Sequence, residues 1–211
     1  MRFSIFALGL LLAGARAEAS PAPIFPPVEL YTLNTHESYV LRPDNSGRFG
    51  ASELAGWTRF LRCHHTGRSH AMAWRVAPLL YDTARHFGLR RVLVVAGYRA
   101  PRIARQKGNP ASPHKDGRAC DFRIDGITIE ALRDYLRAAY NYIGVGYYPN
   151  SNFVHLDVGR KSNVYWVDTS APGQSARYAR TSTILVEDER GPRDKSDESD
   201  EGDDNSSDKL P

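Results

Sequence analysis

Two histidines and one aspartate are the residues of this chain best suited to hold a metal ion. His114 and Asp121 stand seven positions apart in the segment SPHKDGRACD, residues 112–121. His114 ends a polar loop, and Asp121 lies on the strand that we expect to follow it. Gly117 stands between them and permits a tight turn, because glycine adopts backbone angles that other residues avoid. Such a turn can fold the imidazole back toward the carboxylate, so that both face one ion.

A third protein ligand is needed, because a catalytic zinc ion commonly takes three and leaves its fourth position open for water. His155 is the best candidate, since it lies on a strand expected at residues 153–159. Side chains alternate between the two faces of a strand, so Phe153, His155 and Asp157 share one face. Nitrogen and oxygen ligands without sulfur favour one zinc ion in an open, catalytic site.

The elements that must position these residues follow from periodicity and turn signals. The patterns predict strands at residues 29–33, 37–41, 91–96, 118–124, 144–148 and 153–159, and helices at 52–63, 72–87 and 128–140. A polar loop is expected at residues 100–115, and a loop of that length inside a compact domain is usually functional. The expected fold is α+β: a small, mostly antiparallel sheet with helices packed on one side, and the zinc ion in a groove across the sheet.

Both ends of the chain differ from this domain. An early arginine, an apolar run and a small-residue cleavage site predict a signal peptide, and an acidic end poor in apolar side chains predicts disorder. The expected parts are a signal peptide at 1–17, a Pro-rich leader at 18–27, a folded domain at 28–186 that carries the three candidate ligands and an acidic tail at 187–211. No segment after the signal peptide is apolar enough to span a membrane. We therefore expect an exported protein, periplasmic or secreted.

Charge and cysteine content narrow the possible partners. The chain carries a formal charge of +4; residues 187–211 hold eleven acidic and four basic side chains, a net −7, which leaves +11 on residues 1–186. A basic body suits an anionic polymer outside the cytoplasm, although such a charge can also serve solubility alone. Export argues against nucleic acid as a partner, and we expect a monomer. Cys63 and Cys120 can pair in an oxidising compartment or remain buried thiols.

Three motifs together resemble a known family. SPHKDGRACD fits the S-x-H-x-x-G-x-A-x-D signature of the D-alanyl-D-alanine carboxypeptidase-like zinc peptidases. AGYRAP at residues 96–101 and GVGYYPNSNFVHLDVG at residues 144–159 resemble the other landmarks of the YcbK-like branch of murein peptidases. The resemblance covers about residues 28–166. Three motifs in this order and at these separations are highly specific.

The resemblance implies roles for five residues. His114, Asp121 and His155 match the family's zinc ligands. Arg99 matches an arginine placed near the substrate, where a guanidinium can grip a carboxylate through two hydrogen bonds. Ser112 matches a serine that hydrogen-bonds substrate in relatives. The alternatives are a structural arginine that satisfies loop carbonyls and a serine that braces the loop.

At one place the chain departs from the family. Several relatives carry Glu, Asp or His two or three residues before the third ligand, where it acts as general base or orients the water. Here Asn152 and Phe153 stand at those positions, and neither can take a proton. The nearest carboxylate, Asp157, is the expected catalytic residue, which would take a proton and return it to the leaving amine. Alternatively, Asp157 orients a ligand histidine.

Three functions are compatible with these residues. The first is a zinc metallopeptidase that hydrolyses peptidoglycan stem peptides or cross-links, as an endopeptidase or carboxypeptidase and on D,D or L,D bonds. The second is a non-catalytic, hedgehog-like zinc-binding module for the wall or a partner, which the missing upstream carboxylate leaves open. The third is a zinc peptidase for ordinary proteins, against which the match of Arg99 argues. We expect the three tryptophans in the core and not in a platform that stacks on sugars, although Trp166 could line the cleft; they are Trp57, Trp74 and Trp166.

Overall fold

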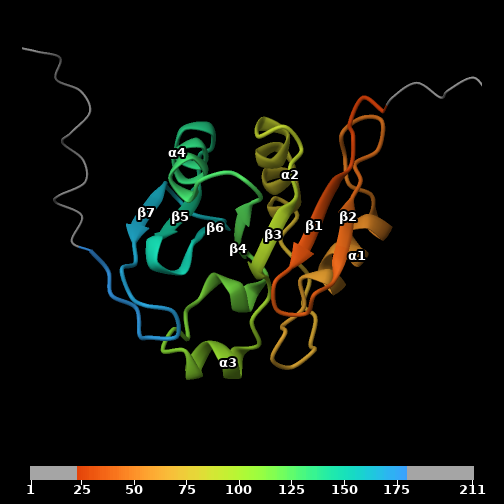
Figure 1. Ribbon diagram of the computed structural model, residues 1–211. Helices are drawn as coiled ribbons and strands as arrows, with labels where there is room; N and C mark the ends of the chain where they lie inside the picture. Colours follow the sequence, from red (N-terminus) through yellow and green to blue (C-terminus); the bar gives the residue numbers. More distant parts are fainter. Residues whose placement is uncertain (1–22, 180–211) are drawn as a thin grey trace, which may run out of the picture.

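A computed structural model describes residues 23–179 of the chain (Figure 1). The predicted signal peptide, the first part of the leader and the acidic tail lie outside the described residues. None of the helices in the described part has the length and the apolar content that a membrane crossing requires.

One seven-stranded sheet organises the domain, with its strands in the spatial order β2-β1-β3-β4-β6-β5-β7. The strands are β1 (Val28–Thr32), β2 (Ser38–Leu41), β3 (Val92–Ala96), β4 (Ala119–Ile124), β5 (Ile143–Tyr148), β6 (Phe153–Val158) and β7 (Val164–Val167). The helices are α1 (Ala51–Phe60), α2 (Val76–His86), α3 (Pro101–Gln106) and α4 (Ile129–Ala139), with 3-10 turns η1 (Pro113–Asp116) and η2 (Pro149–Ser151). Two neighbouring pairs, β1–β3 and β5–β7, are parallel, and the other four are antiparallel.

The prediction of a small, mostly antiparallel sheet was wrong, because the sheet is larger and mixed. Strand β3 runs parallel to β1 because α1 and α2 form a long crossover between β2 and β3, as a parallel pair requires. Strand β7 was not predicted, and the short link at residues 159–163 lets it add parallel to β5, on the side opposite β6. The predicted zinc groove across the sheet is not shown either.

Helices α1, α2 and α4 pack on one face of the sheet (Figure 1). Alternate residues of each strand point to this face, where they form one continuous core with the helices. The largest buried side chains of this core include Trp57 of α1, Leu80 of α2, Leu136 of α4, Phe122 of β4 and Leu156 of β6. Full burial of each such side chain contributes about 1.5–3 kcal/mol of hydrophobic free energy. The helix-covered face therefore fixes which strand residues must point the other way.

Helix α4 begins directly after Thr128, which caps it. The side chain of Thr128 accepts a hydrogen bond from the backbone N–H of Ala131, 3.2 Å away, and so satisfies a donor that the helix leaves free. Helix α2 is shorter than predicted and begins only at Val76. Its expected first turn is held elsewhere, because the N–H of Ala73 donates to the carbonyl of Gly117 at 2.8 Å.

The predicted loop at residues 100–115 contains two short helices instead. Helix α3 begins at Pro101 and η1 begins at Pro113. Proline suits the first position of a helix, because its fixed φ is already helical and its missing N–H would have no partner there. The two prolines thus read as loop residues in the sequence but start helical turns in the structure.

Two glycines on β5 leave room for side chains on the face of the sheet opposite α1, α2 and α4. A Cβ atom at Gly144 would lie 2.3 Å from Oδ2 of Asp157, and one at Gly146 would lie 2.5 Å from Cε2 of Trp166. The sheet register explains these contacts, since Gly144 pairs with Asp157 on β6 and Gly146 pairs with Trp166 on β7. The two bare backbone positions let Asp157 and Trp166 lie against β5.

Substitution of Gly146 by alanine should therefore destabilise the protein through Trp166. We expect Gly146→Ala to lower the free energy of unfolding by about 1–3 kcal/mol, because overpacking forces side chains and backbone apart. The cost should shrink by more than half in a Trp166→Ala background, where the indole is absent. Urea unfolding of the four proteins measures this coupling, and strictly additive costs would contradict it.

Candidate metal centre

His114, Asp121 and His155 converge on the face of the sheet opposite α1, α2 and α4. All three are buried, and their ligand atoms lie within 4.8 Å of one another. Oδ1 of Asp121 lies 3.1 Å from Nε2 of His114 and 2.7 Å from Nδ1 of His155, and the two nitrogens are 3.1 Å apart. Zinc bonds of about 2.0–2.1 Å in a tetrahedral arrangement place ligand atoms about 3.3 Å apart. Two imidazole nitrogens and a carboxylate oxygen at these distances fit one ion of that size.

The sheet places two of these residues directly side by side. Asp121 on β4 and His155 on β6 are register partners in an antiparallel pair, so their side chains leave the same face next to each other. His114 comes from η1, outside the sheet. The predicted tight turn between the two parts of the motif is present, since Gly117 adopts φ +64° directly after η1. A Cβ atom there would also lie 2.2 Å from the carbonyl oxygen of Ala71, so the position requires glycine.

The tautomer of His114 follows from its second hydrogen bond. Nδ1 lies 2.7 Å from the carbonyl oxygen of Gly97, which can only accept, so Nδ1 carries the proton. Nε2 is then left with a lone pair, and this is the nitrogen that faces Asp121 and His155. The backbone therefore prepares His114 to act as a ligand.

Asp157 lies behind His155, on the side away from the other two residues of the cluster. Its Oδ2 is 3.1 Å from Nε2 of His155, whereas Nδ1 of His155 faces the cluster. Arg160 donates from Nε to Oδ1 and from a terminal nitrogen to Oδ2, both at 2.5 Å. The carboxylate is 0% exposed. Of the two roles open to Asp157, this geometry favours orientation of a ligand histidine.

Burial and the charges of neighbouring residues shift the pKa values of the cluster residues in opposite directions. Burial disfavours a positive imidazole, but the hydrogen bonds and negative charges of Asp121 and Asp157 outweigh it and raise the pKa of His155 to about 9. Burial also opposes ionisation of Asp121, yet the two histidines hold the pKa of this carboxyl well below its usual range. For His114, burial prevails and lowers its pKa. Without an ion, His155 thus carries the positive charge, and an ion that binds there must displace a proton.

Arg99 and Ser112 lie close to the cluster in different ways. A terminal nitrogen of Arg99 is 3.7 Å from Oδ2 of Asp121, and the side chain keeps 19% of its surface exposed. Ser112 is buried directly before η1, and its side chain makes no capping hydrogen bond to that helix. Arg99 is therefore placed beside the cluster with access to solvent, whereas Ser112 lies inside the loop that carries His114.

No role in the site was predicted for Tyr148 or Arg160. Tyr148 lies on the site face of β5, and its hydroxyl accepts a hydrogen bond from Nε1 of Trp166 at 3.2 Å. Trp166 is half-buried, with its ring centroid 5.1 Å from that of His155. The alternation of Gly144, Gly146 and Tyr148 along one strand was the available signal for this side of the site. Arg160 had only a weak signal, as a basic residue three positions after Asp157.

The cysteines do not take part in the cluster. Cys63 and Cys120 are both buried and unpaired, so the possible disulfide does not form. Cys120 precedes Asp121 on β4 and therefore points into the core under the helices. Burial and the nearby Asp121 charge raise the pKa of its thiol, which keeps it neutral.

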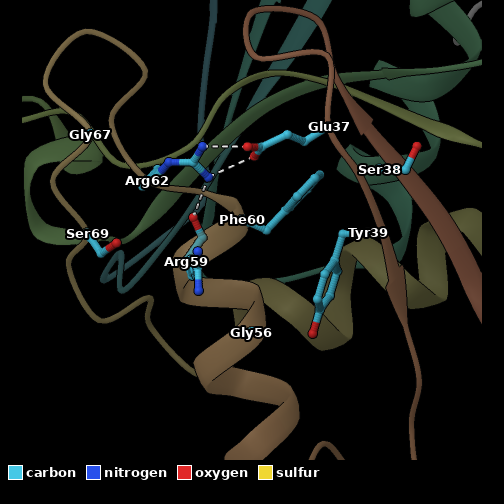
Figure 2. A pocket seen from close by; sticks show the side chains of 9 residues that line it. All are labelled: Glu37, Ser38, Tyr39, Gly56, Arg59, Phe60, Arg62, Gly67 and Ser69. Carbon is cyan, nitrogen blue, oxygen red and sulfur yellow. Dashed lines mark hydrogen bonds and ion pairs between the residues drawn. The ribbon is translucent and has the colours of Figure 1, made fainter.

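A cavity of about 590 Å³ lies elsewhere, beside the edge strand β2 and helix α1 (Figure 2). Within it, Arg62 donates to both carboxylate oxygens of Glu37, at 2.6 and 2.8 Å. None of the three cluster residues lines this cavity, and β1 and β3 separate β2 from β4 in the sheet. The cavity is thus not part of the candidate metal centre.

Comparison with known proteins identifies relatives of the chain. A family model described as peptidoglycan L,D-endopeptidase MepK matches residues 22–164, a range that contains the whole cluster. Peptidoglycan L,D-endopeptidase MepK of Escherichia coli (strain K12) is 32% identical over 176 residues, covering 75% of this chain and 93% of that relative. A probable peptidoglycan L,D-endopeptidase MepK of Haemophilus influenzae is 35% identical over 119 residues, covering 53% of this chain and 63% of that relative. No solved structure matches the chain.

Replacement of Asp157 by asparagine should weaken zinc binding. Asparagine keeps the shape of the side chain but loses the charge that holds His155, and loss of such a partner costs about 10–100-fold in metal affinity. Competition with a chromophoric chelator measures the dissociation constant. Asp168→Asn is the matched control, because Asp168 is also buried but bonds the backbone of Ser170 and Arg177. Equal zinc affinity in the Asp157→Asn and Asp168→Asn variants would contradict the orienting role.

Proposed function

Because the chain belongs to the peptidase family of peptidoglycan L,D-endopeptidase MepK, we propose that it hydrolyses L,D peptide cross-links of peptidoglycan with one bound zinc ion. The expected membership in the YcbK-like murein peptidases is thereby confirmed. The bond that is cleaved, the identity of the metal and the role of each residue are our proposals.

One observation carries this proposal. The residues that the family motif marks as ligands, 41 positions apart at their ends, come together as a buried cluster of two nitrogens and one oxygen. A buried carboxylate between two imidazoles is costly unless its charge is compensated. The cluster also contains no sulfur, which suits a catalytic rather than a structural zinc ion. Family membership and donor chemistry thus support the same reaction.

The reaction adds the oxygen of one water to the carbonyl carbon of the peptide bond, breaks the C–N bond and passes a proton to the leaving amine. A zinc ion, when bound, would supply Lewis acidity toward the carbonyl and lower the pKa of water. His114, Asp121 and His155 would hold it. The contribution of Asp157 is to fix the ring of His155, and Arg160 in turn neutralises Asp157 and holds both its oxygens.

Arg99 is the residue we assign to substrate binding. Its guanidinium lies beside Asp121 and remains partly exposed, so it can form hydrogen bonds to a carboxylate that approaches the cluster. The stem peptides of peptidoglycan carry such carboxylates. Ser112 is buried in the loop before His114, and we assign it to the positioning of that loop and of bound peptide. The export signal expected at residues 1–17 would bring the protein to its substrate.

A second candidate function is a zinc-binding module without hydrolytic activity. The observation that favours it is that both carboxylate oxygens of Asp157 already form hydrogen bonds within the protein. With Asn152 and Phe153 before His155, β6 then offers no free carboxylate to take a proton from water. Such a module would bind zinc and wall fragments but release no products.

Digestion of defined muropeptides separates these functions. The protein without residues 1–17, loaded with zinc, should cleave an L,D cross-linked dimer into two monomers and leave a D,D cross-linked dimer intact. A chelator should abolish the cleavage and added zinc should restore it, with products identified by mass spectrometry. Release of D,D products would contradict the proposed bond. Zinc-loaded protein that binds both dimers but cleaves neither would establish the module instead.

A further inference from the structure

The hydroxyl of Tyr148, next to Trp166 at the candidate metal centre, is a hydrogen-bond donor without a role in the proposed function. Tyr148 ends β5, and the alternation that places Gly144 and Gly146 on the site face places Tyr148 there too. Gly146 pairs with His155 on one neighbouring strand and with Trp166 on the other. Tyr148 therefore lies two residues after Gly146, the position at which β6 and β7 lie on either side of β5.

Trp166 lies over the bare backbone of Gly146 and fixes the direction of the Tyr148 hydroxyl. A Cβ at Gly146 would lie 2.5–2.7 Å from three indole atoms, Nε1 among them, so the indole is packed closely against β5. Nε1 donates to the Tyr148 oxygen at 3.2 Å. An indole N–H can only donate, so the phenol uses a lone pair in this bond and keeps its own hydrogen for another acceptor. Among the described residues, no protein group accepts that hydrogen.

Packing holds the phenol ring in place. It stacks on Phe153 with ring centroids 4.4 Å apart and an interplanar angle of 18°. Burial, and then the negative charge of Asp121, raise the pKa of Tyr148, so the phenol stays neutral. A neutral, oriented O–H beside the cluster is thus preorganised to donate without first breaking a bond to the protein.

We propose that Tyr148 donates a hydrogen bond to the carbonyl oxygen of the scissile peptide bond as that oxygen gains negative charge, and that Trp166 positions Tyr148 for this. The inference rests on the proposed hydrolysis. The phenol keeps its proton throughout: water adds to the carbonyl carbon, the C–N bond breaks, and the proton that the amine receives comes from that water. Donors placed where charge develops stabilise the transition state more than the ground state.

The experiment compares three single variants on the L,D cross-linked dimer. Tyr148→Phe removes only the hydroxyl, and Trp166→Phe removes the N–H that orients it together with part of the indole ring. Tyr147→Phe is the matched control, because Tyr147 is the next residue on β5, points to the helix side and bonds Glu130. We expect Tyr148→Phe to lower kcat about 10²–10³-fold with little change in KM, as loss of one such donor does. Tyr147→Phe should keep kcat and KM.

Two further readouts separate this role from a structural one. A phosphinate isostere of the cross-link peptide mimics the tetrahedral, charged state, and its dissociation constant by calorimetry should rise in Tyr148→Phe about as much as kcat falls. Binding of the product peptides and zinc content should not change. Trp166→Phe should lower kcat about tenfold alone and have no further effect in a Tyr148→Phe background, since it acts through Tyr148.

Each outcome has one meaning. An active wild type with an equally active Tyr148→Phe variant overturns the inference and leaves the proposed function intact. A rise in KM alone, with phosphinate and product affinities lowered equally, also overturns it, because Tyr148 would then bind the ground state as tightly. A wild type that cleaves no cross-link when loaded with zinc overturns the proposed function itself.

Discussion

The antiparallel pairing of β4 with β6 is the constraint on which the rest of the site depends. It makes Asp121 and His155 direct partners, so that a carboxylate and an imidazole leave one face of the sheet 2.7 Å apart. On the other face, the same strands bury Phe122 and Leu156 under the helices. A slip by one residue would turn the polar pair into the core and these apolar side chains out of it. The hydrophobic core therefore sets the geometry of the candidate metal centre.

Hydrogen bonds from neighbouring groups orient the two histidines of the cluster. The carbonyl of Gly97 selects the tautomer of His114, and the Asp157–Arg160 pair fixes the far nitrogen of His155. These contacts orient the ligand atoms, yet they also concentrate charge in a buried space. The raised pKa of His155, about 9, reflects that imbalance, which a bound cation would relieve in place of the proton.

Local sequence patterns predicted the parts of the site but not its surroundings. Strand alternation correctly placed His155 and Asp157 on one face, and Gly117 marked the turn that returns His114 to Asp121. The parallel pairs and β7 could not be predicted, because periodicity shows which face a strand buries but not which strand lies beside it. The contact of Tyr148 with Trp166 depends on such neighbours, so it too became visible only in the structure.

X-ray absorption at the zinc edge tests the central claim most directly, that His114, Asp121 and His155 hold one zinc ion. We expect one zinc ion per chain, nitrogen and oxygen scatterers at about 2.0–2.1 Å, the outer-shell signal of two imidazoles, and no sulfur. The imidazole signal should halve in His155→Ala. A sulfur scatterer at about 2.3 Å, or a spectrum that His155→Ala leaves unchanged, would contradict the account.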